Sequence, residues 1–182
     1  MPPDIPGFQF ITGSAIYWKV IREAIPGAHE FVWIATSDIK DLHAHKGRKM
    51  VPFLEYLSDL VRDGIAVRLL HAKEPGPAFR KDFDRYPDLI EGMERILCPR
   101  VHFKCVIVDG AFAYSGSANL TGAGMGTKSE RRRNFESGFI TTNTGIISGV
   151  MAQFDAVWMG KHCPQCDRKG YCADAKDMIE GN

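Results

Sequence analysis

The segment VHFKCVIVDGAFAYSGSANLTG, residues 101–122, carries more structural information than any other part of the chain. Its first eight residues are rich in β-branched and aromatic side chains, which is typical of a strand. Asp109 and Gly110 form a turn dipeptide, and residues 112–119 have the composition of a second strand that returns beside the first. The sequence therefore predicts a β-hairpin over about residues 100–121.

Alternation of side chains along this hairpin predicts which groups share a face. A period of two residues places His102 and Lys104 on one face of the first strand, with Phe103, Cys105 and Ile107 on the other. The end of the second strand then returns to the start of the first. The plain alternative is a hairpin whose polar side chains are merely exposed to solvent.

The polar groups at this end of the hairpin suit a phosphate. Lys104 supplies positive charge, and Ser117 and Asn119 supply hydrogen-bond donors. His102 supplies a ring nitrogen that can act as a nucleophile or as an acid and base. We therefore expect chemistry on a phosphate group at these four residues.

Six residues fit the spacing His-x-Lys-x4-Asp-x6-Gly-Ser-x-Asn without gaps: His102, Lys104, Asp109, Gly116, Ser117 and Asn119. This pattern resembles the HKD signature of the phospholipase D superfamily, whose members cleave phosphodiesters through a histidine nucleophile. The resemblance extends to Glu136 in RRNFESGFI, at the place of an acidic residue that hydrogen-bonds the histidine and fixes its tautomer. An ordinary surface glutamate is the alternative at this position. Asp109 and Gly116 are expected to be structural, with Asp109 positioning the hairpin backbone.

A second His-x-Lys, formed by His71 and Lys73, does not continue into a signature. Ala78 stands where the pattern has Asp, and no Gly-Ser-x-Asn follows. Superfamily members with two signatures pair them within one chain. A chain with one signature resembles the short bacterial endonucleases of the superfamily, which pair two chains across a twofold axis. The resemblance therefore implies a homodimer.

Helical and strand patterns alternate along the rest of the chain. Helices are predicted from a Ser14 cap to about Ile25, over residues 51–64 and over residues 145–160, and strands over residues 30–38, 66–72 and 135–141. Residues 38–49 are expected to form a polar loop, and residues 74–95 a loop with one helical piece. This order predicts an α/β fold, a phospholipase D-like α/β sandwich with a mixed central sheet flanked by helices. We expect a catalytic domain over residues 1–160 and a Cys-rich tail over residues 161–182.

Composition is that of an ordinary soluble globular protein, with 45% apolar and 25% charged residues among 182. The net charge of +1 provides no overall attraction to a polyanion, so any such attraction must be local. The N-terminus lacks the pattern of a signal peptide, and no apolar run approaches about 18 residues. We therefore expect no membrane span and a cytoplasmic protein whose cysteines are reduced or bound to metal.

Two basic segments supply local positive charge. The first, KDLHAHKGRK, holds His43, His45 and Lys46, and could hold phosphates that flank the scissile bond. A solvated charged loop is the alternative. The second segment lies between the signature and Glu136, and its cations are Lys128, Arg131, Arg132 and Arg133. Because this segment begins and ends near the expected site, we expect it to contact nucleic acid or phosphate.

The tail holds the spacing Cys163-x2-Cys166-x5-Cys172 beside His162, which resembles half of a zinc knuckle. Three thiolates need a fourth ligand, and the candidates are His162, Cys98, His71 or an aspartate. A structural zinc ion is the main expectation, and an iron–sulfur cluster, a disulfide or free thiols are the alternatives. Cys98 and Cys105 are otherwise expected to be small buried residues.

The function expected from these features is that of a phosphodiesterase, above all a metal-independent endonuclease. As the resemblance implies, His102 of one subunit attacks phosphorus to form a phosphohistidine, and His102 of the partner subunit protonates the leaving oxygen. Lys104 and Asn119 would hold the non-bridging oxygens, and no cofactor is needed for this chemistry. One alternative is a phospholipase D acting on lipid headgroups, although no exposed apolar loop or basic amphipathic helix is evident. The other is a non-catalytic nucleic-acid-binding module, against which the complete signature argues.

Overall fold

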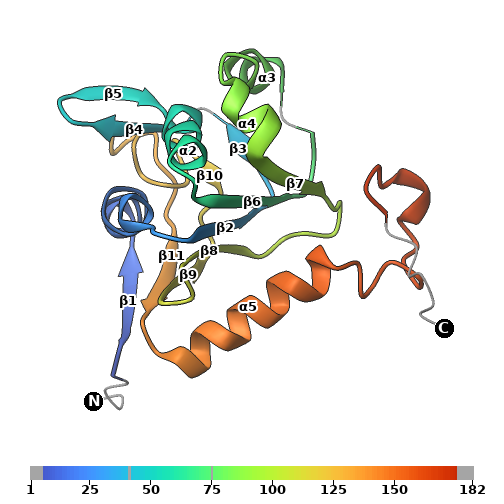
Figure 1. Ribbon diagram of the computed structural model, residues 1–182. Coiled ribbons are helices and arrows are strands. Elements are labelled where there is room, and N and C mark those ends of the chain that lie inside the picture. The colour runs from blue at the N-terminus through green and yellow to red at the C-terminus, as the bar shows by residue number, and fades with distance from the viewer. Residues whose placement is uncertain (1–5, 41, 75, 176–182) are drawn as a thin grey trace.

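A mixed seven-stranded β-sheet forms the centre of the computed structural model, which describes residues 6–40, 42–74 and 76–175 (Figure 1). The strand order is β1-β11-β9-β8-β2-β6-β7. The strands are β1 (Phe8–Thr12), β2 (Phe31–Thr36), β6 (Ala66–His71), β7 (Met93–Leu97), β8 (Lys104–Val108), β9 (Phe112–Gly116) and β11 (Ser137–Thr141). The neighbours β2, β6 and β7 run parallel, and the other neighbours pair antiparallel. The expected mixed sheet and its signature hairpin, β8–β9, are confirmed.

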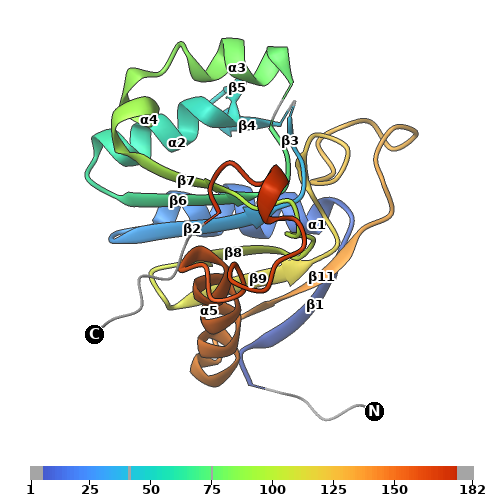
Figure 2. The ribbon, with the colours of Figure 1, turned by 90° about the vertical axis from the view of Figure 1, so that its right-hand side faces the viewer.

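Helices cover both faces of this sheet (Figures 1 and 2). Helix α5 (Thr144–Trp158) packs on one face. The opposite face is covered by α1 (Ser14–Ile16), η1 (Tyr17–Ala24), η2 (Ile25–Gly27), α2 (Phe53–Arg62), α3 (Pro77–Phe83) and α4 (Pro87–Gly92). The expected α/β sandwich is therefore confirmed. Within the described residues, no helix has the length and apolar character needed to cross a membrane.

Successive side chains of β8 point to opposite faces of the sheet, and both faces are buried. Val106 and Val108 belong to the apolar cluster that includes η1 and α2, whereas Cys105 and Ile107 pack with α5. A strand buried on both faces appears in the sequence as a continuous apolar run, as KCVIV does. The hairpin thus lies in the middle of the domain, and its polar residues can act only at its ends.

The first helix differs in kind from the one expected over residues 14–25. A short α-helical segment, α1, continues as the π-helix η1 and ends in the 3-10 turn η2. The expected Ser14 cap is wrong, because Gly13 is the N-cap and Ser14 is already helical. Gly13 has a φ of 54°, a conformation that glycine adopts without steric cost.

Two segments expected to be loops contain regular structure. In residues 38–49, β3 (Ile39–Lys40) pairs with β10 (Leu120–Thr121), and β4 (His43–Lys46) forms a hairpin with β5 (Lys49–Pro52). In residues 74–95, two helices, α3 and α4, and the start of β7 replace the single helical piece expected there. These elements are short, and a periodic pattern needs a longer window to be recognised.

Candidate active site

An open cavity of about 730 Å³ lies at one edge of the sheet. It is lined by residues that follow β2, β6, β7 and β9 or precede β8, and by one residue of the tail: Ser37, Asp38, Ala72, Lys73, Pro99, Arg100, Val101, His102, Asn119 and Arg168. The carboxyl ends of the parallel strands β2, β6 and β7 meet at this edge. Loops at such an edge commonly form the ligand site of an α/β sheet.

His102 is exposed in this cavity and lies two residues before the first residue of β8. The prediction that His102 belongs to the strand is therefore wrong. Lys104 opens β8 and is buried, with 6% of its surface exposed. Its Nζ donates a hydrogen bond to the carbonyl oxygen of His102 over 2.6 Å. Burial lowers the pKa of Lys104, and the nearby negative charge of Glu136 opposes that shift. Lys104 thus holds the backbone of His102 and places positive charge beside it.

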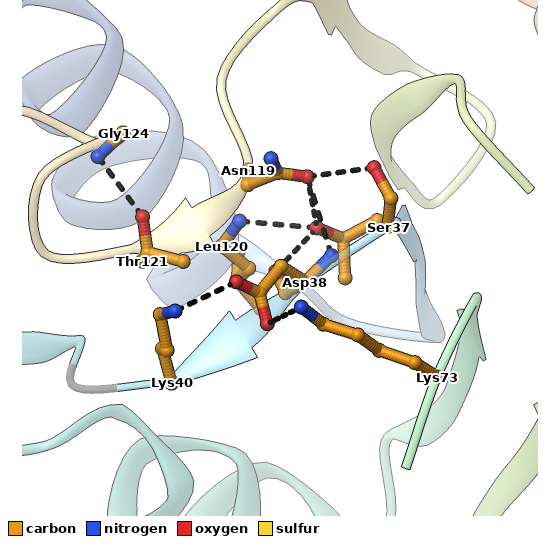
Figure 3. A network of polar contacts seen from close by, with 9 residues as sticks. Ser37, Asp38, Lys40, Lys73, Asn119, Leu120, Thr121 and Gly124 are labelled. Carbon is orange, nitrogen blue, oxygen red and sulfur yellow. Dashed lines mark hydrogen bonds and ion pairs between the residues drawn. The ribbon is translucent and has the colours of Figure 1, made fainter. Parts of the chain in front are cut away.

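Asn119 reaches the same cavity three residues after the end of β9, which pairs with the start of β8 (Figure 3). Its side-chain oxygen Oδ1 accepts hydrogen bonds from Thr36 Oγ1 at 3.3 Å, Ser37 Oγ at 2.9 Å and the backbone N–H of Asp38 at 3.2 Å. These donors fix the amide so that Nδ2 lies on the side away from them. Since an amide nitrogen can only donate, Asn119 presents a donor suited to a phosphate oxygen.

Ser117 and Glu136 are hydrogen-bonded to each other and do not line the cavity. The Ser117 hydroxyl donates to Glu136 Oε2, and Asn134 Nδ2 donates to Glu136 Oε1 over 3.0 Å. The carboxylate is therefore held by Ser117 and Asn134, and its charge acts on Lys104. A hydrogen bond from a ring N–H of His102 to Glu136 stays a prediction.

Asp109 and Gly116 shape the hairpin. Asp109 has a φ of 51°, and its carboxylate accepts the backbone N–H groups of His29, Glu30 and Phe31 at 2.8 to 2.9 Å. Burial alone would raise the pKa of Asp109, but these hydrogen bonds outweigh it and hold the pKa below its ordinary value. A Cβ on Gly116 would lie 2.5 Å from the Ser137 carbonyl oxygen, so only glycine allows β9 to approach β11 this closely.

Three cations of the cavity were not predicted as site residues: Lys73, Arg100 and Arg168. Lys73 belongs to the second His-x-Lys, whose His71 is buried and points its Nδ1 at the Lys73 carbonyl oxygen over 2.8 Å. Burial lowers the pKa of His71, which keeps the ring neutral. Lys73 itself lies 3.4 Å from Asp38 (Figure 3). The sequence showed only that Lys73 follows a predicted strand. The structure adds that this strand, β6, ends beside β2 and so brings Lys73 to the cavity.

The first basic segment does not reach the cavity. His45 stacks on Trp18, and Lys46 pairs with Glu55 and Asp59 of α2. His43 lines a separate cavity of about 300 Å³ between β3, α2 and α3. The structure therefore does not bring these three residues together with His102.

The second basic segment projects between β10 and β11 (Figure 2). Arg131 and Arg132 are exposed, whereas Arg133 pairs with Glu130 over 3.1 Å and the half-buried Lys128 bonds through its backbone N–H to Gly122. These cations do not line the cavity. The same segment leads to Phe135, whose side chain is fully exposed next to Glu136. One exposed apolar side chain therefore lies in the loop that leads to Glu136.

Another cavity, of about 300 Å³, lies between the tail, the last turns of α5 and the segment that joins β7 to β8. Its lining includes all four metal-ligand candidates of the tail, Cys163, Cys166, Cys172 and His162, and also Cys98. The five cysteines are free thiols. Cys105 is buried as expected, and burial raises the pKa of its thiol to about 12. Cys98 was also expected to be buried, but it is only partly buried. Within the described residues, no three His, Cys, Asp or Glu side chains already surround a point where they could hold an ion.

A family model described as "Cardiolipin synthase, PLD-like domain" matches residues 21–158, which is more than half of the chain. No curated protein sequence matches the chain. Among solved structures, NucT from Helicobacter pylori is 16% identical with a TM-score of 0.59, over 81% of this chain and 94% of NucT. Nuc from Salmonella typhimurium, described as a phospholipase D family member, is 16% identical with a TM-score of 0.61, over 85% of this chain and 95% of Nuc. TrmBL2, described as an archaeal chromatin protein with a novel mode of DNA binding, is 14% identical with a TM-score of 0.59, over 87% of this chain and 55% of TrmBL2.

Proposed function

The chain belongs to the family of phospholipase D-like domains, and from this premise we propose that it is an endonuclease that cleaves phosphodiesters with His102 as its nucleophile. The observation that carries the proposal is the common cavity of His102 and Asn119, with the buried Lys104 bonded to His102 at its edge. An exposed imidazole, a fixed amide donor and a nearby ammonium are the groups that nucleophilic attack on a phosphate requires.

The reaction proceeds in two displacements. In the first, a ring nitrogen of His102 bonds to phosphorus, and the bond from phosphorus to the leaving oxygen breaks as that oxygen takes a proton from an acid. In the second, the group that gave up its proton takes one from water, the water oxygen bonds to phosphorus, the phosphorus–nitrogen bond breaks, and His102 is regenerated. Asn119 Nδ2 donates to a non-bridging oxygen, and the charge of Lys104 offsets the negative charge that develops there.

The acid of the first step comes from a second copy of the chain in this proposal. Nucleophile and acid must stand on opposite sides of phosphorus, and one imidazole cannot occupy both places. His102 is the one histidine among the described residues that line the cavity. A homodimer with its axis next to this cavity would bring His102 of the partner subunit to the other side.

Nucleic acid is the substrate that the charges favour. Lys73, Arg100 and Arg168 ring the cavity, and Arg131 and Arg132 are exposed on the nearby segment that leads to Glu136. Cations spread over such a length suit a polymer with several phosphates, because each neutralised phosphate releases counterions. Since the whole chain carries a net charge of only +1, this attraction is local to the site.

A phospholipid headgroup is the second candidate substrate, and Phe135 favours it. An exposed phenyl ring next to the site can enter the surface of a bilayer while the headgroup reaches His102. The same ring can instead stack on a nucleobase. The two substrates therefore have to be separated by direct comparison.

The deciding experiment incubates the protein with labelled single- and double-stranded DNA, RNA and phosphatidylcholine vesicles, each with and without EDTA. We expect cleavage of nucleic acid, unaffected by EDTA and absent in His102→Asn. Cleavage of vesicle lipid alone would establish the second candidate. Cleavage by His102→Asn at the wild-type rate would contradict the assignment of the nucleophile.

Subunit mixing tests the dimer separately. When wild-type protein exchanges subunits with excess His102→Asn protein, most wild-type chains end in mixed dimers that contain one His102 side chain in place of two. The specific activity per wild-type chain should then fall steeply. A specific activity that stays constant, or full activity of a monomer at high dilution, would place the acid within one chain.

A further inference from the structure

Four thiols from two distant parts of the chain line one cavity. Cys163, Cys166 and Cys172 come from the tail, and Cys98 follows β7. Cys172 lies close enough to Cys98 and Cys163 for their charges to interact. Arg100 interacts in the same way with Cys98 and donates a hydrogen bond to Cys166. The remaining cysteine, Cys105, is buried on β8. The thiols are therefore gathered by the fold and not only by the Cys-x2-Cys spacing.

We infer that Cys98 is the fourth ligand of a zinc site formed with Cys163, Cys166 and Cys172. A tetrahedral set of four sulfur atoms is the arrangement that zinc favours in structural sites. The site is assigned by the thiols of this chain and does not depend on the proposed nuclease function.

Backbone contacts hold the two parts of this site in register. Asp174 accepts the Leu97 N–H over 2.6 Å, and the Cys172 thiol donates to the carbonyl oxygen of Leu97 over 3.3 Å. Zinc binding by Cys172 would replace the second bond, because a thiolate has no proton to donate, and would leave the first. Leu97 is the last residue of β7 and directly precedes Cys98. The Cys98 N–H in turn bonds to the His71 carbonyl oxygen over 2.8 Å. Cys98 thus stands on a rigid strand end to which the tail is already attached.

The Cys163–Cys166 segment supplies the turn that two-cysteine ligation needs. The N–H of Cys166 bonds to the carbonyl oxygen of Cys163 over 3.2 Å, which closes a tight turn between the two cysteines. The four sulfurs do not yet surround one point, so zinc binding requires the thiols to rotate inward to the usual zinc–sulfur distance of about 2.3 Å. The cavity of about 300 Å³ leaves room for that rotation.

Positive charge next to the thiols supports four thiolates over a mixed ligand set. Zinc with four thiolates carries a net charge of −2, and Arg100 and Arg168 line the same cavity. His162 also lines it but is exposed and adjacent to Cys163, which makes joint ligation of one ion by both residues geometrically awkward. Pro99, Arg100, Val101 and Arg168 also line the cavity of His102, so zinc would steady one wall of that cavity.

The test is the zinc content of the full chain, purified without chelators from zinc-supplemented medium, for wild type and four variants. We expect about one zinc ion per chain in wild type and a similar large loss in Cys98→Ser and Cys163→Ser. The matched controls, His162→Ala and Cys105→Ala, should keep the wild-type content. Circular dichroism shows whether each variant is folded, and a mercurial reagent added to folded wild type should release the zinc as its thiols react.

Four results would overturn the inference. Wild-type protein without zinc would exclude the site, as would a disulfide among these cysteines found by mass spectrometry of unreduced protein. Full zinc content in Cys98→Ser together with its loss in His162→Ala would make His162 the fourth ligand. Iron with acid-labile sulfide in place of zinc would show that the thiols hold a cluster.

Discussion

Lys104 donates a hydrogen bond from Nζ to the backbone carbonyl oxygen of His102, across 2.6 Å. The donor is buried at the first position of β8, and the acceptor belongs to the exposed residue that faces the cavity. The ammonium therefore has two effects, since it fixes the backbone of the nucleophile and adds positive charge beneath the site. Both effects can be separated from the stability of the sheet.

Lys104→Met should lower kcat/KM by about 100- to 1000-fold, because it removes a charge that stabilises the transition state. The fold should survive, since methionine keeps much of the length of the side chain and an apolar group is easily buried at this position. Steady-state kinetics and urea unfolding measure the two effects. Lys49→Met, at an exposed position of β5, is the control. Wild-type kinetics in Lys104→Met would remove Lys104 from the site.

Asn119→Asp should distinguish the structural role of the side-chain oxygen Oδ1 from the catalytic role of the nitrogen Nδ2. The three donors from Thr36, Ser37 and Asp38 would still meet an oxygen, so the urea midpoint should change little. The donor Nδ2 would be lost and a negative charge would repel phosphate, so activity should fall at least about 100-fold. Asn119→Leu should lose both activity and stability, because it removes the acceptor of the half-buried Ser37 hydroxyl and Asp38 N–H. Comparable activity in Asn119→Asp and wild type would show that Nδ2 does not contact substrate.

Asp109→Asn should make the stability of the protein less dependent on pH. The pKa of Asp109 is lower in the folded than in the unfolded protein, so its ionised form stabilises the fold. This contribution is fully present above the ordinary carboxyl pKa of about 3.9 and is lost as the pH falls through the lower folded value. The variant should be less stable by about 1–3 kcal/mol at pH 7, and the difference should shrink below pH 4. A difference in unfolding free energy that is constant with pH would contradict this account.

The fold could be predicted from the sequence where patterns are long or strongly spaced. The hairpin, the buried strands β2 and β6 and the helices α2 and α5 all follow from periodicity and turn residues. The π-helical form of η1 could not be predicted, because an α-helical and a π-helical turn present similar apolar patterns. The β4–β5 hairpin was missed because its strands, HAHK and KMVP, are short and carry exposed lysines, so they lack the longer apolar alternation that marks a strand.

The site could be predicted only as far as its residues are close in sequence. Lys104 begins one hairpin, and His102 and Asn119 flank its open end, so local spacing is enough to place them together. Lys73 and Arg100 reach the cavity because β8 lies beside β2, β2 beside β6, and β6 beside β7. That strand order is a property of the whole sheet, and no local pattern encodes it. The same reason explains why Cys98 could be named only as one of several partners for the tail.

The central claim is that His102 forms a covalent bond to phosphorus, and a rapid alkaline quench of the first turnover tests it most directly. Protein is mixed with a phosphodiester labelled at phosphorus, quenched in alkali within the first turnover, and digested for mass spectrometry. We predict a phosphoryl adduct on the peptide that contains His102, stable in alkali and lost in acid, and no adduct in His102→Asn. Turnover of the labelled substrate without any adduct on His102, or with the adduct on another residue, would contradict the account.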